Sequence, residues 1–92
     1  MTVALMWEAR AVPGRGADLL AWVRAQPLDP APSRRETFRA PEDRVLVITW
    51  WDPDDPAVTG GTGDPGALPE LPDPDPALVT RPVHRWRFES VD

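Results

Sequence analysis

The pattern of apolar side chains predicts two strands that lie in the middle of a sheet. In Val45–Trp51 the odd and the even positions are both mainly apolar. Successive side chains of a strand point to opposite faces, so this pattern predicts a strand that is buried on both faces. Thr2–Arg10 shows nearly the same pattern before Glu8 and Arg10 interrupt it. Two central strands are therefore expected, one at the start of the chain and one near its middle.

The spacing of apolar residues predicts one helix over Ala17–Gln26. Leu19, Trp22 and Val23 follow the i, i+3, i+4 spacing of one helical face. Pro27 ends the helix, because a proline disfavours the helical backbone conformation in the residue before it.

Two further stretches are predicted to be edge strands. In Arg34–Arg39 the strongly apolar residue is Phe38, which indicates a strand with much of its surface in water. The turn Ala40–Asp43 joins it to the central strand that follows. Pro82–Val91 alternates between a charged face and a face with three large side chains, namely His84, Trp86 and Phe88.

Asp52–Thr80 differs from the rest of the chain, because its prolines exclude a long helix or a central strand. Seven of the 13 prolines lie in this irregular segment. The elements then follow the order strand, helix, strand, strand, irregular segment, strand, within a single domain of residues 1–92. This is an α+β, ferredoxin-like plan with an eroded second helix, in which the first and third strands are central. The two strands with two-sided burial are the first and the third, which agrees with the plan.

The covering elements of this plan all lie on one face of the antiparallel sheet, and the opposite face stays bare. The area of a bare apolar face of several strands exceeds the contiguous apolar surface that a soluble monomer usually exposes, which is roughly a few hundred Å². We therefore expect a homodimer in which the two sheets pack against each other.

The composition narrows the classes of function. A net charge of −5 disfavours nucleic-acid binding as the main role. The absence of cysteine excludes disulfides, and a single histidine argues against a metal site. Met1–Glu8 lacks the basic region of a signal peptide, and Glu8 interrupts its apolar run. We expect a cytoplasmic protein without nucleic-acid or membrane partners.

A second pattern extends over the first half of the chain and the last strand. It consists of Val3–Arg10, of Pro13–Arg15 before an amphipathic helix, and of Glu36–Asp52, where an apolar strand ends in tryptophan and an acidic residue. This pattern resembles the dimeric α/β-barrel superfamily, and within it the antibiotic-biosynthesis-monooxygenase-like domains. The resemblance implies a sheet that forms a barrel with that of a second subunit. It also implies oxygenation of a hydrophobic aromatic compound without a cofactor.

The chain departs from these relatives at two points. In the family a long helix that carries a histidine follows the strand-end tryptophan, and here the proline-rich segment takes its place. Haem-degrading relatives use an asparagine, a tryptophan and a histidine around the porphyrin, and this chain contains no asparagine. Haem degradation is therefore not expected.

His84 is the candidate catalytic residue, because histidine is the side chain that titrates near neutral pH. As a general base it would deprotonate a phenolic or enolisable substrate. The alternative is a strand histidine packed among aromatic residues. This alternative is favoured, because no carboxylate lies at a recognisable spacing from His84. Glu8, near the end of the first strand, is a candidate base or arginine partner.

Aromatic side chains supply a candidate pocket for a flat hydrophobic ligand, since such pockets are mostly apolar and aromatic. Its candidate lining residues are Trp7, Trp50, Trp51, Trp86 and Phe88. The alternative is that these residues pack in the core and at a dimer interface. The sequence also leaves open a non-catalytic dimeric scaffold whose acidic, proline-rich segment docks on an arginine-rich partner.

Overall fold

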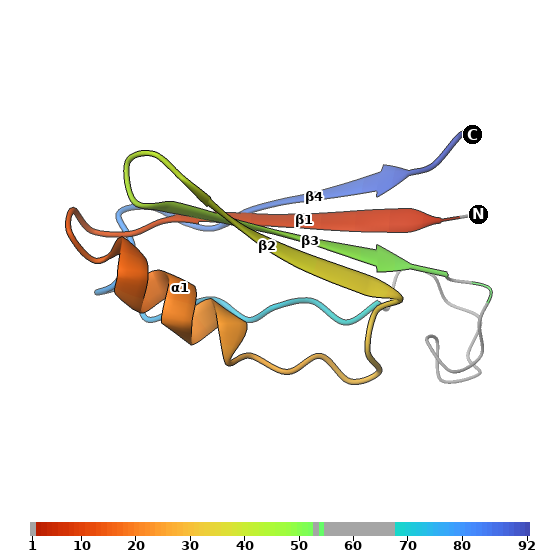
Figure 1. Ribbon diagram of the computed structural model, residues 1–92, viewed down its shortest axis with the longest axis horizontal. Helices are drawn as coiled ribbons and strands as arrows, with labels where there is room; N and C mark the ends of the chain where they lie inside the picture. Colours follow the sequence, from red (N-terminus) through yellow and green to blue (C-terminus); the bar gives the residue numbers. More distant parts are fainter. Residues whose placement is uncertain (1, 53, 55–67) are drawn as a thin grey trace.

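The chain folds into four strands and one helix over the residues that the computed structural model describes, which are 2–52, 54 and 68–92 (Figure 1). These elements are β1 (Val3–Arg10), α1 (Gly16–Arg24), β2 (Arg34–Ala40), β3 (Arg44–Trp51) and β4 (His84–Glu89). The strands form one antiparallel sheet in the order β2-β3-β1-β4. The prediction that the first and third strands are central is confirmed. An antiparallel sheet in this order with a helix after β1 is an α+β fold compatible with the ferredoxin-like plan.

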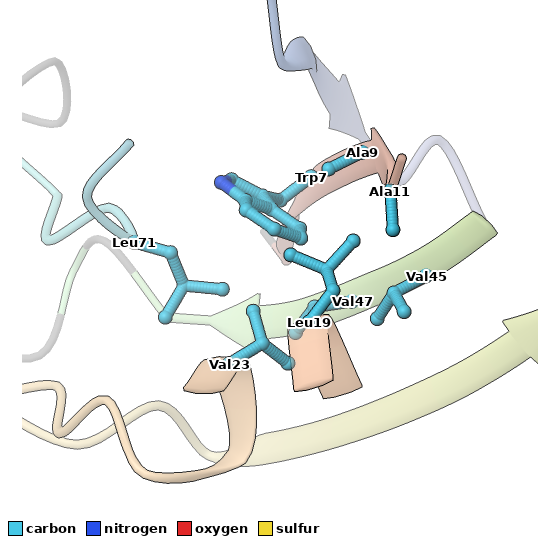
Figure 2. Close-up of a cluster of buried hydrophobic side chains, with 8 residues drawn as sticks. All are labelled: Trp7, Ala9, Ala11, Leu19, Val23, Val45, Val47 and Leu71. Carbon is cyan, nitrogen blue, oxygen red and sulfur yellow. The ribbon is translucent and has the colours of Figure 1, made fainter. Parts of the chain in front are cut away.

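The face of the sheet beneath α1 holds the hydrophobic core. β1 and β3 contribute alternate side chains to it, since their register places Trp7 opposite Val47. The helix contributes Leu19 and Val23, both fully buried. At nine residues, α1 is too short to cross a membrane, and the described residues include no other helix that could. The main cluster consists of Trp7, Ala9, Ala11, Leu19, Val23, Val45, Val47 and Leu71 (Figure 2).

The segment after β3 replaces the second helix of the ferredoxin-like plan. Residues 53 and 55–67 of this segment lie outside the described part of the chain. Residues 68–79 run beside α1 on the same side of the sheet (Figure 1). Leu68 and Leu71 are buried, at 7% and 5% exposure. An irregular stretch thus covers the core where the plan has a helix.

The opposite face of the sheet, which we name the open face, has no covering element among the described residues (Figure 1). Phe38, Trp86 and Phe88 are 38%, 47% and 54% exposed on it. The central strands, which the pattern predicts to be buried on both faces, are therefore only half-buried on this one. The apolar members of the open face are Ala4, Met6, Phe38, Leu46, Ile48, Trp50, Trp86 and Phe88.

Asp43 connects the β2–β3 turn to the loop after β1. Its Oδ2 accepts a 3.1 Å hydrogen bond from the backbone N–H of Gly14, and its carbonyl accepts one of 2.8 Å from that of Ala11. Glu42 and Asp43 both have a positive φ, 66° and 59°, which costs a non-glycine residue roughly 1–2 kcal/mol. The two bonds help to hold Asp43 in this conformation. A Cβ on Gly16 would lie 2.7 Å from Oδ1 and 3.2 Å from Cα of Asp43.

We expect Gly16→Ala to lower the free energy of unfolding by about 1–2 kcal/mol, although alanine has the higher helix propensity. The added methyl group displaces the Asp43 carboxylate and breaks its bond to Gly14. Urea denaturation followed by tryptophan fluorescence measures the change. Gly14→Asn is the comparison, because nothing lies within 4 Å of its added Cβ, so its loss of stability measures only the strain of a φ of 84° in a residue other than glycine. A Gly16→Ala variant as stable as the wild type would contradict this close approach.

Candidate functional site

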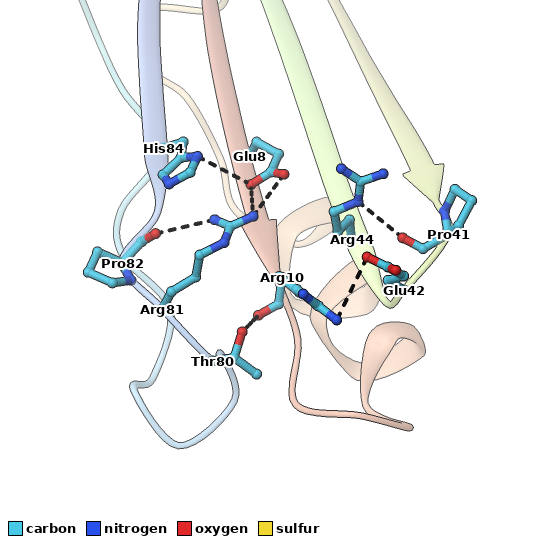
Figure 3. A network of polar contacts seen from close by, with 9 residues as sticks. All are labelled: Glu8, Arg10, Pro41, Glu42, Arg44, Thr80, Arg81, Pro82 and His84. Atoms are coloured by element: carbon cyan, nitrogen blue, oxygen red, sulfur yellow. Dashed lines mark hydrogen bonds and ion pairs between the residues drawn. The ribbon is translucent and has the colours of Figure 1, made fainter.

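The side chains of Glu8, Arg81 and His84 meet at one end of the open face (Figure 3). The register pairs Glu8 of β1 with His84 of β4, so both project from the same face. Arg81 lies just before β4, and its Nη2 is 2.6 Å from Oε1 and 2.9 Å from Oε2 of Glu8. Nδ1 of His84 is 4.0 Å from the same Oε1. We name these three residues the polar cluster.

Glu8 is the most withdrawn member of the polar cluster. Its side chain is 16% exposed, against 28% for Arg81 and 48% for His84. A carboxylate removed from water to this extent needs a hydrogen-bonding partner, and arginine supplies a charge-assisted one. The register places Glu8 beside Leu46 of β3. The polar cluster therefore borders directly on the apolar part of the open face.

His84 contacts both the polar and the aromatic part of this face. Its ring and that of Trp86 have centroids 5.3 Å apart at an interplanar angle of 76°, an edge-to-face arrangement. Its Nδ1 is the nitrogen near Glu8, at a distance typical of an ion pair rather than a hydrogen bond. Glu8 therefore lies on the Nδ1 side of the ring, and Nε2 is the nitrogen at which a ligand proton would be accepted.

The five predicted pocket residues lie on two different faces of the sheet. Trp50, Trp86 and Phe88 belong to the open face. Trp7 and Trp51 are buried in the core face, at 4% and 0% exposure. The cause is the alternation of a strand, which sends consecutive side chains to opposite sides. One chain therefore does not bring all five side chains into a single pocket.

The core side of the sheet has no room for an aromatic ligand in the cavity beside Trp7. That cavity, which Thr49 and Leu71 also line, has a volume of about 20 Å³. A water molecule needs roughly 10–15 Å³ by the same measure, whereas ligand pockets span roughly 300–1,000 Å³. Nε1 of Trp7 has no hydrogen-bond partner within the described part of the chain, so a water fits this site chemically. This cavity therefore does not hold an aromatic ligand, whereas Trp86 and Phe88 of the open face are exposed.

The sequence pattern singles out His84 and Glu8, and the structure adds Arg81. The interpretation of Glu8 as an arginine partner is confirmed. Sequence spacing could not identify Arg81 as that partner, because 73 positions separate the two residues. The carboxylate near His84, which spacing alone does not reveal, is Glu8. The one signal available was the antiparallel pairing of the first and last strands, which places Glu8 opposite His84.

Comparison with protein-family models, with curated proteins and with solved structures found no match for this chain. Across residues 2–52, 54 and 68–92, no three histidine, aspartate or glutamate side chains gather closely enough to hold a metal ion. The function has to be argued from the open face and the polar cluster themselves.

We expect a double-mutant cycle of Glu8→Gln and Arg81→Gln to give a coupling energy of about 1–2 kcal/mol, because both side chains are mostly withdrawn from water. Chemical denaturation of the four proteins measures it. Arg34 and Glu36 form the matched control: Nη2 of Arg34 is 2.8 Å from Oε2 of Glu36, between the 2.6 Å and 2.9 Å of the Arg81–Glu8 pair, but the side chains are 66% and 42% exposed. The coupling of this control pair should stay below about 0.5 kcal/mol. Equal couplings for the two pairs would show that the burial of Glu8 contributes nothing.

Proposed function

We propose that the chain is one protomer of a homodimer in which the open faces of two sheets pack against each other, as in the dimeric α/β barrels that its sequence resembles. The observation that carries this proposal is the uncovered apolar face of the sheet. α1 and residues 68–79 both cover the other face (Figure 1). A second copy is the simplest cover, because a two-fold axis brings the same apolar patch of each protomer together.

The size of the open face supports this proposal. The exposed fractions of Phe38, Trp86 and Phe88 correspond to roughly 300 Å² of apolar surface, at about 200 Å² for a fully exposed aromatic residue. Covering this area in both protomers contributes about 15 kcal/mol at 25 cal/mol per Å². Association costs roughly 4–15 kcal/mol. The half-buried Met6 and Ile48 add further apolar area, so the balance favours a dimer.

The arrangement of polar residues on the open face also resembles that of an interface. Protein interfaces combine an apolar, aromatic centre with a polar rim. Here Met6, Ile48 and Trp86 form a central row. Glu36 of the edge strand β2 lies beside Ile48 at the end of this row and is paired with Arg34, and the other charged residues of this face lie toward the ends of the strands. At one corner the guanidinium of Arg34 lies 4.9 Å from the ring centroid of Trp50, a cation–π contact.

We expect the wild-type protein to sediment as a dimer at micromolar concentration and Trp86→Glu to sediment as a monomer. A carboxylate in the centre of the interface would be buried without a partner, which costs several kcal/mol. Analytical ultracentrifugation measures both. Ala21→Glu on the exposed side of α1 makes the same change in charge away from the open face and should remain dimeric. A monomeric wild type, or a dimeric Trp86→Glu, would refute the proposed interface.

The polar cluster gives this dimer a second role, the binding of a hydrophobic aromatic small molecule that carries a phenolic or enolisable group. The aromatic body would lie at the end of the open face, beside the half-exposed ring of His84 and outside the central row, and its acidic proton would face Nε2 of His84. His84 would accept this proton, and the nearby Glu8 would stabilise the imidazolium that forms. The substrate carbanion then reacts with O₂ without a cofactor. One oxygen atom enters the product as a carbonyl, and the other leaves as water with two hydrogen atoms of the substrate.

We expect polycyclic aromatic phenols to quench the tryptophan fluorescence saturably at micromolar concentration, because Trp50 and Trp86 lie on the open face. His84→Ala should weaken the quenching and abolish any oxygen uptake. Glu89→Gln, at the exposed end of β4, is the control and should leave both unchanged. Quenching that His84→Ala leaves intact would place the ligand elsewhere. The absence of quenching by every compound would leave the dimer without this role.

The scaffold alternative depends on an acidic, proline-rich segment that is free to dock on a partner. In the described part of this segment, Leu68 and Leu71 pack into the core of their own chain. Asp73 is paired with Arg85 of β4 at 2.8 Å. These contacts fix residues 68–79 to the sheet and favour the first proposal over this one.

A further inference from the structure

A groove between α1 and the edge strand β2 collects three arginines. Its volume is about 700 Å³, and its walls are Leu20 and Arg24 of α1 and four residues of β2, which are Arg35, Glu36, Thr37 and Arg39. Arg35, Thr37 and Arg39 alternate along β2, and their register partners on β3 point to the core face. The groove therefore lies on the helix side of the sheet and remains accessible when the open face is covered.

The arginines of this groove have no carboxylate partner among the described residues. Arg24, Arg35 and Arg39 form no ion pair with any other described residue, whereas Arg10, Arg15, Arg34, Arg81 and Arg85 do. The acidic residue of the groove, Glu36, is paired with Arg34 at 2.8 Å. The groove thus contains three guanidinium groups and one carboxylate, and that carboxylate is already paired with Arg34. This is notable in a chain whose net charge is −5.

Arg35 is held rigidly at the centre of this groove. Its Nη1 donates to the carbonyl of Gln26 and its Nη2 to that of Val23, both at 2.7 Å. Val23 lies in the last turn of α1 and Gln26 two residues beyond its end, where a cation interacts favourably with the helix dipole. Desolvation by burial lowers the pKa of Arg35 from its ordinary value. A guanidinium that is already ordered loses little further entropy when a ligand binds.

We infer that the α1–β2 groove is a binding site for a small molecule with two or more carboxylate or phosphate groups. Guanidinium groups bind such oxyanions through paired, charge-assisted hydrogen bonds. The hydroxyl of Thr37 supplies a further donor, and Leu20 provides an apolar wall. Several negative charges are favoured, because Arg24, Arg35 and Arg39 line the same groove and together carry three positive charges. This site is separate from the open face and does not depend on the dimer.

Titration of the full chain with inorganic pyrophosphate and, separately, with tricarballylate tests this inference. The arginine Nε–Hε and backbone amide signals in ¹H–¹⁵N NMR spectra report the position of binding. We expect saturable shifts at Arg24, Arg35, Thr37 and Arg39 below millimolar ligand concentration. Arg24→Gln combined with Arg39→Gln should weaken binding at least about tenfold, since the double variant removes two of the three guanidinium groups of the groove. Both residues are exposed, so the double variant should retain its dispersed spectrum.

The matched control is Arg10→Gln combined with Arg15→Gln, which removes the same charge outside the groove and should change the affinity less than twofold. Binding of either probe with this pattern supports the inference and identifies phosphate or carboxylate as the preferred group. Absence of saturable shifts with both probes would overturn it. Equal weakening in the two double variants would also overturn it, because it would indicate attraction to overall charge rather than a site.

Discussion

The central strands β1 and β3 carry apolar side chains on both faces, and the described residues cover only one of these faces. α1 has nine residues, and the described part of the proline-rich segment has no helix to add to it. Both lie on the same face, where Trp7, Trp51, Leu19 and Leu71 are buried. The other face leaves aromatic side chains in water at a cost of about 25 cal/mol per Å². The proposed dimer is a consequence of this imbalance.

The uncovered face also explains where chemistry can occur. Glu8, Arg81 and His84 meet at its end, so a ligand bound at this end lies beside the one histidine of the chain. The cavity beside Trp7 on the core face is too small for such a ligand. The arginine groove between α1 and β2 is on the opposite side and is chemically different, since it is cationic rather than aromatic. The two candidate sites can therefore be tested independently.

The pattern of apolar and polar residues was enough to predict the strands, the helix and the central position of β1 and β3. A strand buried on one face alternates apolar and polar residues, and a strand buried on both faces is apolar at nearly every position. The same alternation places Trp50 and Trp51, which are consecutive in β3, on opposite faces of the sheet. The prediction of one pocket lined by both was therefore inconsistent with the prediction of the strand. Arg81 could not be predicted as the partner of Glu8. Its position depends on an irregular segment, where no periodicity indicates the direction of a side chain. The arginine groove depends on the packing of α1 beside β2, which sequence spacing does not contain.

The most direct test of the account is an isotope-filtered NOE experiment on an equal mixture of ¹³C-labelled and unlabelled protein. Such an experiment detects only contacts between different copies of the chain. The account predicts cross-peaks between the ring of Trp86 in one protomer and the side chains of Met6 and Ile48 in its partner. Cross-peaks that involve α1 instead, or no intermolecular cross-peaks at micromolar to millimolar concentration, would contradict a dimer formed through the open face.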